Sequence, residues 1–185
     1  MITIRRARPS DAPAIGAVHV AAWRSAYPGI LPDAYLARLS VPRQAAHYDG
    51  AIRDGALIYV LTATGRDLPS PTVAASGRVI GFVTAAKSTS LADGEVETLY
   101  ILDDWRERGL GRLLLSTAAT HLSSIGCRSV FLWVLRDNPS RFFYQHLGGR
   151  AIAESQTMVA GQALAQIAFA WDPIERLVQS ASRAN

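Results

Sequence analysis

The sequence is poor in several features that would mark particular kinds of protein. It has one cysteine, Cys127, in 185 residues, which excludes an internal disulfide framework and fits a reducing compartment. The four histidines and the cysteine lack the spacing of metal ligands, so we expect no metal site. No apolar run approaches the roughly 20 residues of a membrane span. The N-terminus also lacks the order of a signal peptide, and we therefore expect a cytoplasmic protein.

Charge is sparse as well. Charged residues make up 18% of the chain and apolar residues 49%, which is the composition of a globular protein. Nineteen basic against fifteen acidic residues give a net charge of +4, and Lys87 is the only lysine. The arginines are scattered, with no dense basic run and no interleaved aromatic residues, so we expect no nucleic-acid partner. A modest positive excess is compatible with an anionic small molecule.

Apolar periodicity predicts a mixed α/β domain. Strands are expected over residues 2–6, 56–64, 78–86, 96–102, 128–135, 150–159 and 163–171. Helices are expected from an N-cap at Ser10 to about residue 27, and over 31–39, 41–53, 110–125 and 139–147. Residues 65–77 and 87–94 are predicted to be polar loops. The length favours one domain over residues 1–172, followed by a polar tail over 173–185.

The segment 95–115 carries the strongest local signal. An apolar strand leads into Arg106-Glu107-Arg108-Gly109-Leu110-Gly111, and a leucine-rich helix follows. A glycine loop at a helix N-terminus directs backbone N–H groups to one point, where the helix dipole also attracts an anion. Arg108 and Arg112 could add charge-assisted bonds. A dinucleotide loop would need a third glycine at residue 114, and a P-loop would need Gly-Lys-Ser/Thr, so a phosphate loop of another kind or a simple turn remains.

Further motifs follow this loop in a fixed order. They are Leu113-Leu114-Leu115, the apolar strand near 130–135, Asn138, and Phe143-Tyr144 followed by Leu147-Gly148. Together with Leu99-Tyr100-Ile101 and the loop 106–111, this block resembles the GNAT superfamily of N-acetyltransferases. Residues 23–33, beginning Trp-Arg-Ser-Ala-Tyr-Pro-Gly, look like a bacterial branch of that superfamily with mostly unassigned substrates.

The resemblance implies a mixed, mostly antiparallel sheet of about seven strands with helices on both faces. It also implies transfer of an acetyl group from acetyl-CoA to an amine, by direct attack in a ternary complex. A backbone N–H near Leu99 would bind the oxyanion, and Ile101 would pair with the pantetheine arm. The expected cofactor-binding residues, by the same resemblance, are Leu99, Ile101, Arg106, Arg108, Gly109, Leu110, Gly111, Arg112 and Asn138. The resemblance further favours a homodimer.

The chemistry needs a base, an acid and an acceptor site. Glu95 and Glu97 are alternative bases whose side chains lie two apart on one strand face, and a water chain is a third alternative. By the same resemblance Tyr144 occupies the position of the acid, with a role as a packing tyrosine as the alternative. Trp23 and Tyr27 are candidates for the acceptor wall, with core packing as the alternative.

Four functions remain open at this stage. The first is an N-acetyltransferase acting on the primary amine of a small molecule. The second is an acetyltransferase of protein N-termini or lysines, and the third is a non-catalytic acyl-CoA-binding module. The fourth is a nucleotide-binding protein that does not use CoA. Cys127 follows Gly126 with no nearby histidine in the sequence, so we expect a buried thiol rather than a nucleophile.

Overall fold

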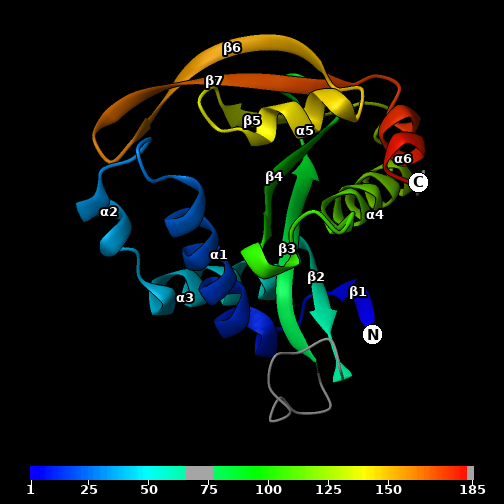
Figure 1. Cartoon of the computed structure of the whole chain (residues 1–185). Helices are drawn as coiled ribbons and strands as arrows, with labels where there is room; N and C mark the ends of the chain where they lie inside the picture. Colours follow the sequence, from blue (N-terminus) through cyan, green and yellow to red (C-terminus); the bar gives the residue numbers. More distant parts are fainter. Residues whose placement is uncertain (66–76, 183–185) are drawn as a thin grey trace.

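The computed structural model describes residues 1–65 and 77–182, which build one seven-stranded sheet flanked by helices (Figure 1). The strand order is β1-β2-β3-β4-β5-β7-β6. The strands are β1 Ile2–Arg6, β2 Leu57–Ala63, β3 Arg78–Lys87, β4 Gly94–Ile101, β5 Val130–Leu135, β6 Arg150–Val159 and β7 Gln162–Trp171. Every neighbouring pair is antiparallel except β4 with β5. The expected fold class is therefore confirmed.

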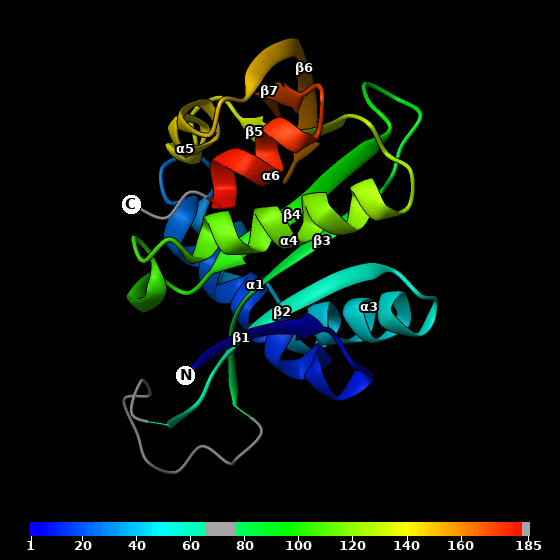
Figure 2. The same ribbon diagram turned by 90° about the vertical axis from the view of Figure 1, so that its right-hand side faces the viewer.

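Helices cover both faces of the sheet (Figures 1 and 2). They are α1 Ala12–Ala26, α2 Asp33–Ala37, α3 Val41–Arg53, α4 Leu110–Ser124, α5 Ser140–His146 and α6 Glu175–Ser182, with short 3-10 turns η1 Pro9–Asp11 and η3 Asp103–Trp105. Helices α1 and α3 lie on one face, where their apolar stripes pack on β2 and β3. Helices α4 and α6 lie on the other face, over the larger core.

The parallel contact between β4 and β5 is short. Only two residue pairs are in register, Gly94 with Val130 and Glu95 with Phe131. Beyond Glu95 the two strands diverge, although β4 continues to Ile101 and β5 to Leu135. The sheet is therefore open between its two central strands, and one backbone edge of β4 over residues 97–101 lies along this opening.

Strand β4 also contains a β-bulge. Ala85 of β3 pairs with Val96, and its neighbour Thr84 pairs with Thr98, so Glu97 is one additional residue. A bulge breaks the two-residue alternation of side chains. Val96 and Leu99, three residues apart, consequently both pack in the core under α4. The simple alternation used to place Glu95 and Glu97 on one face does not extend through this position.

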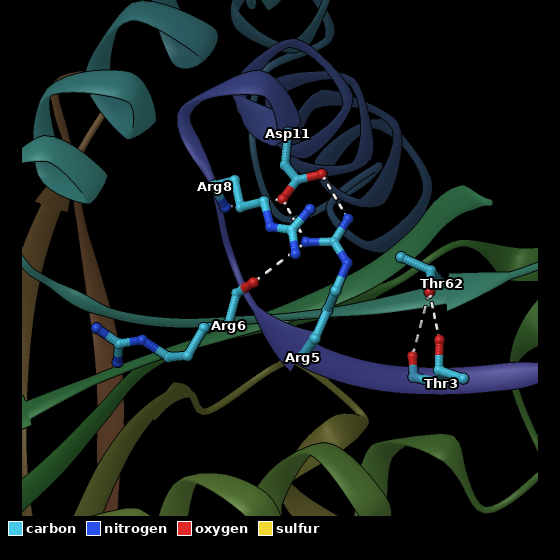
Figure 3. A network of polar contacts seen from close by, with 6 residues as sticks. All are labelled: Thr3, Arg5, Arg6, Arg8, Asp11 and Thr62. Atoms are coloured by element: carbon cyan, nitrogen blue, oxygen red, sulfur yellow. Dashed lines mark hydrogen bonds and ion pairs between the residues drawn. The ribbon is translucent and has the colours of Figure 1, made fainter. Parts of the chain in front are cut away.

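The start of α1 is fixed by an ion pair rather than by the predicted serine cap. Both nitrogens at the end of the Arg5 side chain donate to Asp11, at 2.7 and 2.8 Å, and the Arg8 N–H donates to Asp11 Oδ2 at 2.8 Å (Figure 3). The chain enters α1 through the turn η1, and α1 has no side-chain cap. The prediction of Ser10 as N-cap was therefore wrong, because Asp11 supplies the acceptor and Arg5 holds it in place.

The segment expected to be a polar tail contains helix α6. Ile174 and Leu177 are fully buried in the core beside α4. The Ser180 hydroxyl donates to the carbonyl of Leu147, which ties α6 to the end of α5 at 3.0 Å. We propose that the single domain extends through α6. Most of the predicted 65–77 loop lies outside the described residues.

Candidate active site

The glycine loop reaches α4 through two residues with positive φ. Glu107 has φ 60° and Gly109 has φ 73°, and Gly109 is the N-cap of α4. The first helical hydrogen bond of α4 runs from the Leu113 N–H to the Gly109 carbonyl at 3.2 Å. The amides of Leu110 and Gly111 precede this bond, in the turn where a helix has no acceptors of its own for its N–H groups. This is the geometry of an anion-binding helix N-terminus.

The arginines of the loop are held by its own acceptors. Arg106 forms an ion pair with Asp103 at 2.9 Å. Arg108 donates to the Asp104 carbonyl at 2.9 Å, and its guanidinium lies 4.9 Å from the ring centre of the buried Trp105. Each guanidinium has five N–H donors, so these contacts fix the loop and still allow further bonds to an anion. Arg112 lies half-buried on the first turn of α4.

The second glycine of the loop has a packing role. A Cβ on Gly111 would lie 3.2 Å from Cζ of Phe143, whereas a Cβ on Gly109 would meet nothing within 4 Å. Gly109 is thus required by its backbone conformation, and Gly111 by the close approach of α5. As a result, the N-terminus of α4 and helix α5, which carries Tyr144, lie side by side.

The edge of β4 presents alternate amides to the opening in the sheet. The Leu102 N–H donates to the Ile80 carbonyl of β3 at 2.9 Å. Because N–H direction alternates along an extended strand, the Tyr100 N–H also faces β3. The N–H groups of Leu99 and Ile101 therefore face the opposite edge, from which β5 has diverged.

Tyr144 and Asn138 lie on the far side of this opening. Tyr144 is 8% exposed and packs beside Phe143 and Phe169. Burial raises the pKa of its phenol, and nearby Tyr27 raises it further, so the hydroxyl is protonated at neutral pH. Asn138 Oδ1 accepts the Ser140 N–H at 2.9 Å, so its side chain binds the first amide of α5, although the N-cap position itself is Pro139, one residue later than expected.

The two glutamates of β4 differ in their surroundings. Glu95 is half-buried, and burial followed by the charge of Glu97 raises the pKa of its carboxyl. Glu97 is exposed at the bulge. Its charge also contributes to raising the pKa of Tyr48 on α3, after the larger effect of burial. The charge of Glu97 therefore acts on Glu95 and on the side of β4 that faces α3.

Four rings form an aromatic cluster between α1, α3 and β4, namely His19, Trp23, Tyr48 and Tyr100. The indole N–H of Trp23 donates to the Tyr100 hydroxyl at 2.9 Å, and His19 Nδ1 lies 2.8 Å from the Tyr48 hydroxyl. His19 stacks on Trp23 with ring centres 5.3 Å apart and meets Tyr100 edge-on at 5.2 Å. Of the two acceptor-wall candidates from the sequence, Trp23 belongs to this cluster, and the ring of Tyr27 meets Trp23 edge-on with ring centres 4.9 Å apart.

Tyr27 and Cys127 are core residues. Tyr27 is buried with Leu31 and Leu36, although a polar contact with Asn138 moderates the pKa increase that burial causes. Cys127 is 4% exposed, and burial raises the pKa of its thiol, which confirms the expected buried cysteine. Its Sγ lies 3.4 Å from the Asp93 carbonyl, six residues before Leu99. At about 3.3 Å per residue this is roughly 20 Å along β4 from the open edge.

Two other kinds of site, a metal centre and a membrane-spanning helix, are absent from the described part of the structure. Over residues 1–65 and 77–182, no three histidine, cysteine, aspartate or glutamate side chains gather as metal ligands would. Within the same ranges, no helix combines the length and the apolar character needed to cross a membrane.

Known proteins share both the sequence and the fold. The sequence model of the acetyltransferase (GNAT) family matches residues 26–148. The uncharacterized N-acetyltransferase YuaI of Bacillus subtilis is 31% identical over 180 residues, 96% of each protein. A GCN5-related N-acetyltransferase from Rhodopseudomonas palustris has a TM-score of 0.69 at 18% identity, covering 92% of this chain and 94% of that one. The yncA protein of Salmonella typhimurium, whose structure includes its cofactor acetyl-CoA, has a TM-score of 0.64 at 20% identity, covering 93% and 94%. By its sequence match and its fold, the chain belongs to the GNAT family of acetyltransferases.

Proposed function

We propose that this protein transfers an acetyl group from acetyl-CoA to the primary amine of a small molecule, by direct attack in a ternary complex. The observation that carries the proposal is the opening between β4 and β5, which pair at only two positions. The α4 loop and Tyr144 border this opening from one side, and the two glutamates and the aromatic cluster from the other. The donor and acceptor therefore have separate approaches to one strand edge.

The donor side fits a long, phosphorylated thioester. The amides at the start of α4, with Arg106, Arg108 and Arg112, suit a pyrophosphate. The outward N–H of Ile101 suits an amide arm that lies along β4 as an added strand would. Asn138, 8% exposed at the start of α5, is placed to contact the same arm. Acetyl-CoA would supply the activated acetyl group at the end of this arm.

Two groups serve the reacting carbonyl. The N–H of Leu99 faces the opening and would stabilise the negative charge that develops on the carbonyl oxygen. Tyr144 would donate a proton to the departing sulfur, since its phenol is protonated at neutral pH. A positioned acid or base contributes roughly 10²–10⁴-fold to rate.

Glu95 is the stronger base of the two glutamates, and Glu97 is the one closer to Leu99 along β4. A raised pKa makes a carboxylate a stronger proton acceptor, and this applies to Glu95. Glu95 is four residues from Leu99, about 13 Å along the strand, so it would act through water. Glu97 is about 7 Å away by the same rise and would hold the ammonium form of the acceptor before it loses its proton.

Direct attack is favoured over a covalent enzyme intermediate by the position of the thiol. Cys127 is buried and lies roughly 20 Å along β4 from Leu99. A small acceptor is favoured over a protein segment because the aromatic cluster presents half-buried rings linked to one another by hydrogen bonds. Sites for small molecules are typically lined in this way.

The proposal is tested by measuring release of the CoA thiol over a panel of small amines, peptides and amino acids. We expect turnover with small amines and a loss of roughly 10²–10⁴-fold in kcat for Tyr144→Phe. Tyr59→Phe is the matched control. It removes a hydroxyl that is hydrogen-bonded to His121 Nδ1, with 2.9 Å between the two atoms, at a place remote from this opening. No binding of acetyl-CoA, or full activity of Tyr144→Phe, would overturn the proposal.

A second measurement assigns the base. Glu95→Gln should abolish the rise of kcat/KM with pH that reports the free carboxylate, and Glu97→Gln should mainly raise the KM for the amine. If Glu97→Gln removes the pH dependence and Glu95→Gln keeps it, the assignment of Glu95 is wrong.

A further inference from the structure

Two hydrogen bonds join the four rings of the aromatic cluster in pairs. The Trp23 N–H is bonded to the Tyr100 hydroxyl at 2.9 Å, and the Tyr48 hydroxyl to His19 at 2.8 Å. Three of the rings, His19, Trp23 and Tyr100, are still partly exposed. A ligand that reaches the cluster therefore meets ring surfaces more than hydrogen-bonding groups. The faces of aromatic rings attract cations and apolar groups.

A glutamate supplies negative charge beside the cluster, whereas the arginine next to Trp23 in sequence is directed away from it. Burial, together with the charge of His47, lowers the pKa of His19 to about 4, so its ring is neutral at pH 7. Arg24 follows Trp23 in sequence, but its guanidinium is directed to the carbonyls of Leu36, Ala37 and Leu39, at 3.0–3.1 Å. Glu97 of β4 is the carboxylate whose charge acts on Tyr48 of the cluster, and Glu95 lies within range of Glu97.

On the opposite side of the opening, the arginines are also held by other groups. Arg136, which follows β5, forms an ion pair with Glu154 of β6 at 2.5 Å. Arg106, after β4, is paired with Asp103. The Ser25 hydroxyl at the end of α1 donates to the same Asp103 carboxylate. The charges of Arg106 and Arg136 at the opening are thus each offset by a carboxylate.

We propose that the acceptor is an aromatic or alkyl monoamine that carries no carboxylate, held by its cationic ammonium at Glu97 and by its apolar group against His19, Trp23 and Tyr100. This inference rests on the proposed acetyl transfer and specifies the class of acceptor. The Glu97 carboxylate beside a set of ring faces favours a cation with an apolar body. The same carboxylate repels an acceptor whose own carboxylate lies next to the amine, and such like-charge contacts are a common source of specificity.

The test compares three acceptors that share one side chain. They are 2-phenylethylamine, phenylalanine and phenylalaninamide, which differ in carrying no group, a carboxylate or a neutral amide beside the amine. We expect kcat/KM for 2-phenylethylamine to exceed that for phenylalanine by at least about tenfold, a range typical of selection by a pocket. Phenylalaninamide should fall close to the amine, since its added group has similar size to a carboxylate but no charge. The gap between amine and amino acid should narrow as salt is raised.

The role of the ring is tested in the same assay with two variants of Trp23. Trp23→Leu should raise the KM for 2-phenylethylamine by at least about tenfold and leave the KM for acetyl-CoA unchanged. Trp23→Phe keeps a ring and should restore most of the lost affinity. A melting temperature close to that of the unmodified protein shows that both variants are folded.

The outcomes separate the two proposals. Phenylalanine acetylated as well as 2-phenylethylamine would overturn the inference while leaving acetyl transfer in place. The same holds if Trp23→Leu and Trp23→Phe both leave the KM for the amine unchanged. Acetyl-CoA binding with no turnover on any of the three acceptors or on the wider amine panel would overturn the proposed function, and the inference with it.

Discussion

Gly16 and Gly50 offer the same substitution in two helices with opposite expected results. Gly16 lies in α1 where that helix packs on α3. A Cβ at Gly16 would lie 2.7 Å from the amide nitrogen of Ala45 and 2.9 Å from the carbonyl oxygen of Val41. Gly50 lies within α3, and a Cβ there would meet nothing within 4 Å. Helix propensity alone predicts that alanine stabilises both positions by up to about 1 kcal/mol.

Packing reverses the sign at Gly16. The atoms that the new methyl group would meet belong to the backbone of α3, so they cannot rotate away. Overpacking of this kind costs about 1–3 kcal/mol, and more where the backbone must move. After subtracting a gain in propensity of up to about 1 kcal/mol, we expect Gly16→Ala to lower the free energy of unfolding by up to about 2 kcal/mol, and by more where the α3 backbone must shift. For a domain of this length, about 2 kcal/mol corresponds to a fall in Tm of about 4–8 °C, whereas Gly50→Ala should raise Tm by about 1–4 °C.

Thermal and urea unfolding of the two variants, followed by circular dichroism, measure both effects. A Gly16→Ala protein as stable as Gly50→Ala would refute the close packing of α1 on α3. The change should also reach the site, because α1 carries His19 and Trp23 and α3 carries Tyr48. We therefore expect Gly16→Ala to raise the KM for the amine more than the KM for acetyl-CoA.

Two further predictions concern the ends of the domain. Hydrogen bonding to Arg5 lowers the pKa of Asp11, so its contribution to stability is present above the ordinary carboxyl pKa near 4 and is lost as pH falls through the lowered value. Asp11→Asn should lower the free energy of unfolding by about 1.5–3 kcal/mol at pH 7, and the difference from the unmodified protein should shrink below about pH 4. The control is Asp49→Asn, which breaks an exposed i,i+4 pair with Arg53 and should change the free energy of unfolding by less than about 1 kcal/mol. Equal losses of stability in the two variants would contradict the argument. Leu177→Ala should lower the free energy of unfolding by about 2–5 kcal/mol if α6 belongs to the domain. The control Leu113→Ala, at a side chain that is 46% exposed, should lower it by less than about 0.5 kcal/mol. A negligible effect of Leu177→Ala would mean that α6 is a dispensable tail.

Features with local causes could be predicted from the sequence. Helix α3 runs over Val41–Arg53 as expected, because proline suits its first turn and the Ser40 hydroxyl accepts the Arg43 N–H. The positive φ of Gly109 follows from the place of the loop between strand and helix. The hydrogen bond from the Ser140 N–H to the Asn138 side chain at the start of α5 likewise joins residues only two apart. In each case the interaction lies within one turn of the residues that encode it.

Features with distant causes could not be predicted. Asp11 displaced Ser10 because of Arg5, a residue on the neighbouring strand. Helix α6 looked polar because its stripe is narrow, and its burial depends on α4. The four rings of the aromatic cluster come from three separate elements, because Tyr48 lies on α3 and Tyr100 on β4. The i,i+4 spacing of His19 and Trp23 on α1 was the one signal of the cluster in the sequence.

The bulge at Glu97 explains how one strand can serve both partners of the reaction. Without the additional residue, strict alternation would place Thr98 and Tyr100 on the same face as Val96, which packs under α4. The bulge instead allows Val96 and Leu99 to pack under α4, while Thr98 bonds Thr84 at 2.8 Å and Tyr100 meets Phe82 on the α1 face. Tyr100 can therefore bond Trp23, and Leu99 still directs its N–H into the opening beside β5. In the proposed reaction, this one-residue irregularity would set the acceptor side and the donor side on opposite faces of β4.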